Sequence, residues 1–125
     1  MPTYEAGDFE PPAPVVRATI RGQNNKVLHG VPLLIDTGAD ISLIPLDVVD
    51  AVGGVTQPSE TPIQFLDGEQ INCLQSELTV EFLMYRFRGA FLTAECSYGI
   101  LGRNILNLLH INLDGPNLSW SVSHG

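Results

Sequence analysis

The sequence contains, at residues 33–38, the stretch Leu33-Leu34-Ile35-Asp36-Thr37-Gly38. Its first three residues are bulky and apolar, a pattern that favours a buried strand. Asp36 stands where that strand ends, and Gly38 allows a backbone turn that would strain most other residues. The stretch therefore predicts an aspartate carboxylate held in place at the end of a buried strand. Taken alone, it also fits an aspartate whose side chain only caps a turn.

Strand patterns precede this stretch, and a helix pattern follows it. Apolar residues over 15–20 and 27–35 flank the turn-rich Gly22-Gln23-Asn24-Asn25, which predicts a β-hairpin. After Asp36, the residues from Pro45 to Val52 favour a short helix, which the two following glycines bring to an end.

The second half of the chain continues in short strands. The pair Asp67-Gly68 favours a two-residue hairpin turn between 63–66 and 69–72. Further elements are expected as strands over 78–82 and 87–95, a short helix over 104–109, and a closing hairpin of 111–113 with 118–122. No turn residue marks the junction after residue 82. Strands and turns dominate throughout, so the fold class is all-β, a small closed barrel or a sandwich.

Length and composition favour one domain. The chain has 125 residues, the size of a single domain, and 44% of them are hydrophobic, enough to fill one core. Residues 1–14 hold four of the nine prolines and three acidic residues, which disfavour helix and central strand. We therefore expect a flexible N-terminal arm over 1–14 and a single domain over 15–125.

The charge of the chain restricts its partners. Fourteen acidic residues against six basic ones give a formal net charge of −8 and a pI near 4.5. Nucleic acid and anionic membranes are therefore not expected as partners, because both are negatively charged. The acidic N-terminus and the absence of a long apolar run predict a cytoplasmic protein. Cys73 and Cys96 fit free thiols, and the scattered histidines indicate neither a metal site nor a cofactor.

A second motif, Ile100-Leu101-Gly102-Arg103-Asn104, lies far downstream and leads into the expected C-terminal helix. Together, residues 34–40 and 100–106 resemble the two motifs of the retropepsin-like aspartic proteases, a family of retroviral, retroelement and single-domain bacterial enzymes. The resemblance runs from about Val15 to Val122, and the ending over 113–120 is most similar to bacterial, particularly cyanobacterial, members. It implies a small closed all-β barrel of the retropepsin type with one or two short helices, working as a homodimer.

The resemblance implies an aspartic endopeptidase. Hydrolysis of an amide by water needs one group that accepts a proton and another that donates one. The chain has a single Asp-Thr-Gly, so by resemblance two copies meet about a twofold axis, with Asp36 of each as a catalytic residue. Two carboxyl groups that lie so near each other share one proton, which implies an acidic pH optimum. Peptides or proteins are the implied substrates.

The residues after Asp36 take roles by the same resemblance. Thr37 and Gly38 belong to the active-site loop, and the hydroxyl of Thr37 ties the loops of the two copies together. Gly38, Ala39 and Asp40 are the implied substrate-binding residues of this loop.

Asp40, Gly102 and Arg103 match the family's structural brace, in which the helix arginine holds the loop after the catalytic aspartate. A guanidinium holds a carboxylate through two parallel hydrogen bonds, so we expect a buried Asp40–Arg103 pair. Arg103→Lys is then expected to weaken folding or dimerisation more than the same change at an exposed arginine, Arg17.

The hairpin at Asp67-Gly68 occupies the position of the family's flap, a ribbon that closes over a bound peptide. Asp67 and Gly68 are therefore expected to contact substrate, although retroviral flaps contain more glycines than this tip. An ordinary surface hairpin explains the same turn equally well. Ile44, Phe65, Ile71 and Leu101 fit either apolar subsites or the core.

Two other interpretations stay open. The same fold, if Asp36 did not meet the Asp36 of a second copy, would be a catalytically silent dimerisation or peptide-binding module. The low glycine content of the flap tip favours this interpretation. A fragment of a retroelement polyprotein would predict a precursor, whereas Met1 and the short arm favour a stand-alone product. The intact Asp36-Thr37-Gly38 favours the enzyme.

Overall fold

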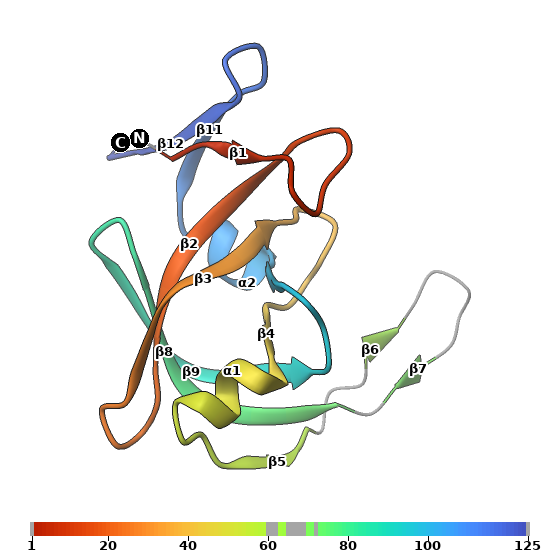
Figure 1. Ribbon diagram of the computed structural model, residues 1–125, viewed down its shortest axis with the longest axis vertical. Coiled ribbons are helices and arrows are strands. Elements are labelled where there is room, and N and C mark those ends of the chain that lie inside the picture. Colours follow the sequence, from red (N-terminus) through yellow and green to blue (C-terminus); the bar gives the residue numbers. More distant parts are fainter. Residues whose placement is uncertain (1, 60–62, 65–69, 72, 125) are drawn as a thin grey trace.

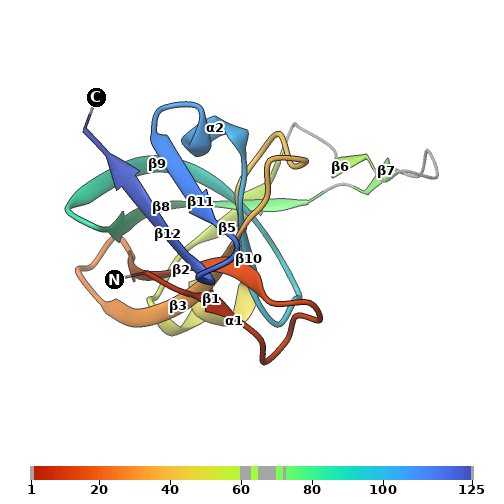
Figure 2. The same cartoon turned by 90° about the horizontal axis from the view of Figure 1, so that it is seen from above.

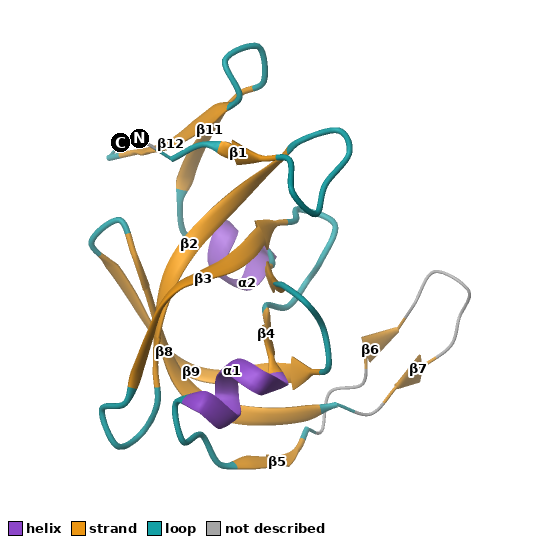
Figure 3. Ribbon diagram, viewed as in Figure 1, coloured by secondary structure: helices purple, strands orange, loops and turns teal. Residues whose placement is uncertain are grey.

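The computed structural model describes residues 2–59, 63–64, 70–71 and 73–124 (Figure 1). Strands dominate this part of the chain, and two short helices interrupt them (Figure 3). In chain order the elements are β1 (Tyr4–Glu5), β2 (Ala13–Arg21), β3 (Val27–Ile35), β4 (Leu43–Pro45), α1 (Leu46–Ala51), β5 (Thr56–Pro58), β6 (Ile63–Gln64), β7 (Gln70–Ile71), β8 (Leu74–Phe82), β9 (Tyr85–Ala94), β10 (Gly99–Leu101), α2 (Arg103–Leu106), β11 (His110–Asp114) and β12 (Ser119–Ser123). The all-β class predicted from the sequence is confirmed.

The main sheet closes into a barrel. Its strands are ordered β1-β2-β3-β10-β4-β9-β8-β5, and an additional pairing of β2 with β8 closes the ring. Strand β10 runs parallel to β3, and β4 runs parallel to β9, whereas β2 is antiparallel to both β3 and β8. Parallel neighbours are never consecutive in the chain, so this topology brings distant residues together. The closed barrel with short helices is therefore confirmed.

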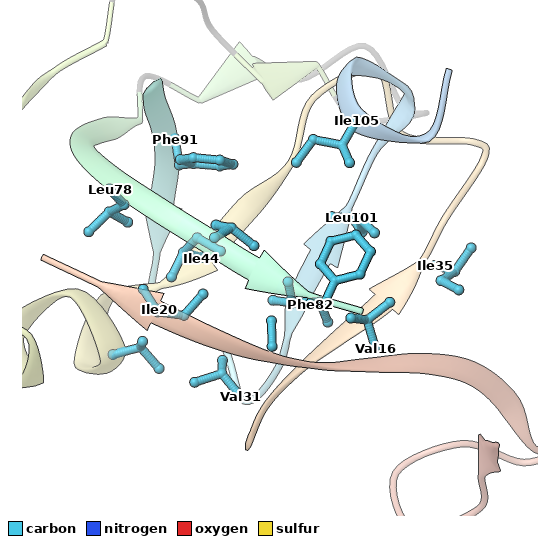
Figure 4. Close-up of a cluster of buried hydrophobic side chains, with 14 of the residues drawn as sticks. Val16, Ile20, Val31, Ile35, Ile44, Leu78, Phe82, Phe91, Leu101 and Ile105 are labelled. Atoms are coloured by element: carbon cyan, nitrogen blue, oxygen red, sulfur yellow. The ribbon is translucent and has the colours of Figure 1, made fainter. Parts of the chain in front are cut away.

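Apolar side chains that alternate along the strands fill the barrel. On β2, Val16, Ala18 and Ile20 are buried, while Arg17 between them is exposed. Figure 4 shows that side chains from β2, β3, β4, β8, β9 and β10 converge on one cluster. A slip of one residue would turn each strand's apolar side chains to solvent, so the core holds the strand register.

The N-terminal residues do not form the free arm that their composition predicted. Strand β1 pairs with the first residues of β2, Tyr4 opposite Pro14 and Glu5 opposite Ala13. The N–H of Tyr4 also donates to the carbonyl of Leu118 at 2.8 Å, which ties β1 to the C-terminal hairpin. Prolines disfavour helix and central strand but are tolerated at a sheet edge, where β1 lies. Residues 4 and 5 therefore join the edge of the main sheet.

Other elements lie close to their predicted places. The β2–β3 and β11–β12 hairpins and helix α1 are confirmed. The helix expected over 104–109 is shorter, because α2 ends at Leu106. Leu108 and Leu109 then continue as tight turns, in which each N–H donates to the carbonyl three residues earlier. No helix in the described residues is long and apolar enough to cross a membrane.

The turn between β8 and β9 lies at Leu83-Met84, a place that the sequence does not indicate. Both residues have positive φ, 48° and 71°, a conformation that asparagine and glycine adopt at lower cost. The pairing of Phe82 with Tyr85 leaves only two residues for the turn. Strand pairing therefore overrides the local preference of leucine and methionine.

Replacing Leu83-Met84 with Asn-Gly is expected to raise the free energy of unfolding by about 1 kcal/mol, because the new residues tolerate positive φ. Chemical denaturation measures the gain, provided that the m-value is unchanged. Val55→Gly is the control, since Val55 is also exposed but does not have positive φ, and glycine there lowers stability. A double variant no more stable than the native chain would remove backbone strain as the explanation.

Strands β6 and β7 form a separate two-stranded ribbon that extends away from the barrel (Figure 1 and Figure 2). Ile63 pairs with Ile71 and Gln64 with Gln70, in antiparallel register. The base of the predicted hairpin is thus present. The tip that contains Asp67 and Gly68 lies outside the described residues.

Candidate active site

Asp36 lies at the carboxyl end of β3, directly beside β10. These two strands run parallel, with Leu101 opposite Ile35. The backbone N–H of Asp36 donates to the carbonyl of Leu101 at 3.1 Å. The two sequence motifs are distant in the chain, and parallel pairing brings them together at one end of the barrel.

The Asp36 carboxylate is oriented by its own loop. Its Oδ1 accepts a hydrogen bond from the backbone N–H of Gly38 at 2.9 Å. The N–H of Ala39 donates to the carbonyl of Asp36 at 3.2 Å, which closes a tight turn. Asp36 is half-buried, whereas Thr37 and Gly38 are exposed. The carboxylate is therefore held in place and remains within reach of a ligand or a second protein chain.

Helix α2 holds this loop from behind. The N–H of Arg103 donates to the carbonyl of Ala39 at 2.8 Å, and the N–H of Asn104 donates to the carbonyl of Asp40 at 3.2 Å. The guanidinium Nη1 of Arg103 also donates to the carbonyl of Thr37, at 2.7 Å. The brace expected between the second motif and the loop is thus built on backbone carbonyls.

The side chains of Asp40 and Arg103 do not form the buried pair expected from the sequence. Both residues are exposed, and no salt bridge joins them in the part of the chain that the structure describes. An exposed ion pair gains little energy in water and orders two flexible side chains. The carbonyl of Thr37 instead gives the guanidinium an acceptor that the loop already holds in place.

Ser42 and Asn104 were not predicted as site residues, yet they connect the two motifs at the base of the loop. Oδ1 of Asn104 accepts from the N–H and from the Oγ of Ser42, at 3.0 and 2.8 Å. The Oγ of Ser42 in turn accepts from the N–H of Gly102 at 2.9 Å. Ser42 is buried, and a buried hydroxyl needs partners. A serine within the apolar run 41–44 was the signal that could have revealed this contact.

Arg103→Lys is expected to lower the free energy of unfolding by about 1 kcal/mol, because a flexible ammonium replaces a planar donor at the Thr37 carbonyl. Arg17 is not the free control that the sequence suggests, since it forms an ion pair with Glu5. Arg88→Lys is the better control, because no ion pair of Arg88 occurs among the described residues. Thermal unfolding compares the two variants, and equal losses would mean that the Arg103 side chain contributes nothing to the loop.

Other groups that could take part in catalysis or binding are the thiols, clusters of metal-ligating side chains, and the apolar side chains considered as substrate subsites. Burial raises the pKa of the Cys73 thiol, and burial together with the charge of Asp47 raises that of Cys96, so both stay protonated at neutral pH. Within the described residues, no cluster of three or more His, Cys, Asp or Glu side chains is placed to hold a metal ion. Ile44 and Leu101 are 0% and 1% exposed and therefore belong to the core rather than to apolar subsites. Phe65, another candidate for an apolar subsite, lies outside the described residues.

Comparison with known proteins agrees with the fold and with the family that the two motifs resemble. A family model for retroviral aspartyl protease matches residues 10–114. EIAV protease complexed with the inhibitor HBY-793 is similar in structure, with 23% sequence identity and a TM-score of 0.62 over 82% of this chain and 92% of that one. Proteases of this family typically act on peptides as homodimers. Because the family model spans most of the sequence, the chain belongs to the retroviral aspartyl protease family.

Proposed function

We propose that this protein is an aspartic endopeptidase that works as a homodimer, with Asp36 of each copy as its catalytic residue. The observation that supports this most directly is the half-buried Asp36 carboxylate, oriented by the N–H of Gly38 at the end of β3. Membership of the protease family supports the same reaction. The sequence contains one Asp-Thr-Gly, so a second copy supplies the second carboxyl group.

The two carboxyl groups divide the proton transfers of amide hydrolysis between them. The ionised group accepts a proton from water, whose oxygen attacks the peptide carbonyl carbon, while the protonated group donates to the carbonyl oxygen. A proton then passes to the amide nitrogen, and the C–N bond breaks. Two carboxyl groups a few ångströms apart hold one proton between them, because simultaneous ionisation is unfavourable. The pair thus contains one acid and one base at the same pH.

Residues beside Asp36 are proposed to bind the peptide and to stabilise the dimer. Gly38, Ala39 and Asp40 follow the catalytic residue in a loop held by α2, which makes their backbone groups a rigid surface for an extended peptide. Thr37 is exposed on the same loop and is assigned the contact with the second copy. Asp67 and Gly68 are assigned to the flap over the substrate, a role supported by the antiparallel base of the β6–β7 ribbon.

The rate of cleavage is expected to follow a bell-shaped pH profile with an acidic maximum. At low pH both carboxyl groups of the pair are protonated and no base remains, whereas at high pH both ionise and no acid remains. Measurement of kcat/KM on one peptide from about pH 3 to 8 tests this expectation. A rate that stays constant through neutral pH would contradict a shared proton.

Cleavage of a mixed peptide library at about pH 4–7 tests the function itself. We expect cleavage that a statine-type inhibitor blocks, since its tetrahedral hydroxyl group resembles the transition state. The cleaved sites then give the specificity. A folded, dimeric protein that cleaves no peptide would overturn the enzyme and support the peptide-binding module.

A further inference from the structure

A surface cleft of about 340 Å³ lies where strands β2, β8 and β9 meet the turn between β2 and β3. Arg21, at the end of β2, lines this cleft and pairs with Val27, the first residue of β3. Asp36 follows the last residue of the same strand. The cleft therefore lies at the opposite end of β3 from the candidate active site, and the turn beside it is far from the loop between β3 and β4 (Figure 1).

The floor of the cleft is Thr79, in β8. It lies directly opposite Arg21 of β2 on one side and Arg88 of β9 on the other. Directly opposite residues of paired strands project from the same face of a sheet, so two arginines flank the threonine. Thr79 is 8% exposed, and its hydroxyl has no hydrogen-bond partner in the part of the chain that the structure describes. Because buried hydroxyls are normally paired, the floor offers a hydrogen bond to a ligand that enters the cleft.

The two arginines keep donors for a ligand. No ion pair of Arg88 occurs among the described residues. Arg21 uses Nε and Nη2 for Glu81, at 3.2 and 3.1 Å, and its Nη1 forms no hydrogen bond within the described residues. Arg86 binds the other oxygen of Glu81 at 2.8 Å, so Glu81 is already shared between two guanidinium groups. Three arginines and two glutamates, Glu77 included, leave a net charge of +1 on this face, whereas the whole chain carries −8. The cleft therefore attracts anions.

The charges of the cleft favour a carboxylate over other anions. A guanidinium binds a carboxylate or a phosphate through two parallel hydrogen bonds. Glu77 also lines the cleft, and its negative charge disfavours a doubly charged phosphate. The side-chain amides of Gln23 and Asn25, at the rim, can both donate and accept, which suits a peptide group beside the carboxylate. The volume of about 340 Å³ is in the range of pockets that hold small ligands. The cleft therefore suits a short peptide that carries one carboxylate.

We propose that this cleft binds a peptide carboxylate, held between the guanidinium groups of Arg21 and Arg88 above the hydroxyl of Thr79. Such a carboxylate has two sources, the C-terminus of a peptide and an acidic side chain. Neither involves Asp36, so the proposal goes beyond the proposed function and does not depend on it. The protein then contacts peptides at two separate places, one at each end of β3.

Titration of the isotope-labelled native chain with N-acetylated Ala-Ala, followed by NMR at about pH 6.5, tests the proposal, because the dipeptide carboxyl group is ionised at this pH. We expect saturable shifts of the backbone N–H signals of Arg21, Thr79 and Arg88, and none with the same dipeptide amidated at its C-terminus. N-acetylated Asp-Ala amide carries its charge on a side chain, and the tighter of the two charged dipeptides identifies the source of the carboxylate. Shifts confined to residues 36–40, equal shifts with charged and amidated dipeptides, or no shift with any of them would overturn the proposal.

Arg88→Gln tests the guanidinium that has no ion pair among the described residues. Arg88 is exposed, so the fold should be retained, which circular dichroism checks. We expect the dissociation constant of the charged dipeptide to rise about tenfold or more, since charge-assisted hydrogen bonds are lost. Arg86→Gln is the matched control, because Arg86 lies on the same strand and face and loses the same charge but does not line the cleft. Equal rises for the two variants would mean a general attraction of anions and would overturn the site.

Thr79→Val tests the floor and leaves both arginines in place. Valine has nearly the shape of threonine, and the lost hydroxyl has no partner among the described residues, so the free energy of unfolding should not fall. We expect the dissociation constant of the charged dipeptide to rise about threefold or more. Thr93→Val is the control, because the hydroxyl of Thr93 is also buried and without a partner in the described part of the chain but lies outside the cleft. Equal dissociation constants for the two variants would overturn the position of the carboxylate above Thr79.

These experiments measure binding and not cleavage, which separates the cleft from the proposed function. A chain that binds the charged dipeptide but cleaves no peptide would keep the carboxylate site and overturn the protease. A chain that cleaves peptides, and whose signals for Arg21, Thr79 and Arg88 do not respond to the dipeptide, would keep the protease and overturn the carboxylate site.

Discussion

Asp36→Asn is expected to reduce kcat/KM for peptide cleavage by about 10³-fold or more, because the active site loses its acid and its base together. The asparagine side chain keeps an Oδ1 that can accept the hydrogen bond from the N–H of Gly38, which is 2.9 Å long in the native chain. The fold and the dimer should therefore survive the substitution. Sedimentation and thermal unfolding verify this before activity is compared.

Asp50→Asn is the matched control for this experiment. Asp50 is an exposed aspartate of α1, so its substitution makes the same change of charge without touching the Asp36 loop. Its activity should equal that of the native protein. If Asp36→Asn still cleaves at the native rate, another group must activate the water and the proposed catalytic role is wrong.

Gly102→Ala is expected to lower the free energy of unfolding by about 1–3 kcal/mol and to reduce activity with it. A Cβ at this position would lie 2.7 Å from the carbonyl carbon and oxygen of Ile41, and 3.0 Å from the carbonyl oxygen of Ala39. These are backbone atoms of the loop that leads from Asp36 to β4, so they cannot rotate aside as a side chain can. The loop must shift, and the carboxylate of Asp36 shifts with it.

The expected loss of stability in Gly102→Ala comes from steric crowding and not from backbone conformation. Its φ of −95° is accessible to every residue. Gly115→Ala is the control, because a Cβ at Gly115 has no atom within 4 Å. Chemical denaturation compares the two variants. Equal stability would mean that the close contact between Gly102 and the loop does not constrain the site.

Elements that depend on a few neighbouring residues were predicted well from the sequence. The β2–β3 hairpin depends on a turn-rich segment between two apolar runs, and α1 depends on its proline start and glycine end. The turn at Leu83-Met84 was not predicted, because strand pairing and not residue preference determines it. The N-terminal segment was misjudged for a related reason. Its prolines indicate only that the segment is neither a helix nor a central strand, whereas its place at the sheet edge depends on β2 and on the C-terminal hairpin.

In the candidate site, too, local features could be predicted and contacts between distant segments could not. Asp36 and the second motif could be recognised because both are short contiguous segments that together resemble the motifs of one family. The contacts of Ser42 with Asn104 and with Gly102 could not, since each joins residues that only parallel pairing of β3 and β10 brings together. The acceptor of Arg103 was misassigned to the carboxylate of Asp40, because charge is visible in a sequence and a backbone carbonyl is not.

The sequence by itself determined the all-β class, the place of the β2–β3 and β11–β12 hairpins and the aspartate at the end of a buried strand, because each depends on neighbours within a few residues. Only the tertiary structure decided that β3 and β10 lie side by side, that α2 holds the Asp36 loop through backbone carbonyls, and that β1 pairs with the start of β2. These features depend on how the closed barrel satisfies its backbone hydrogen bonds and buries its core, and both conditions involve the whole chain at once.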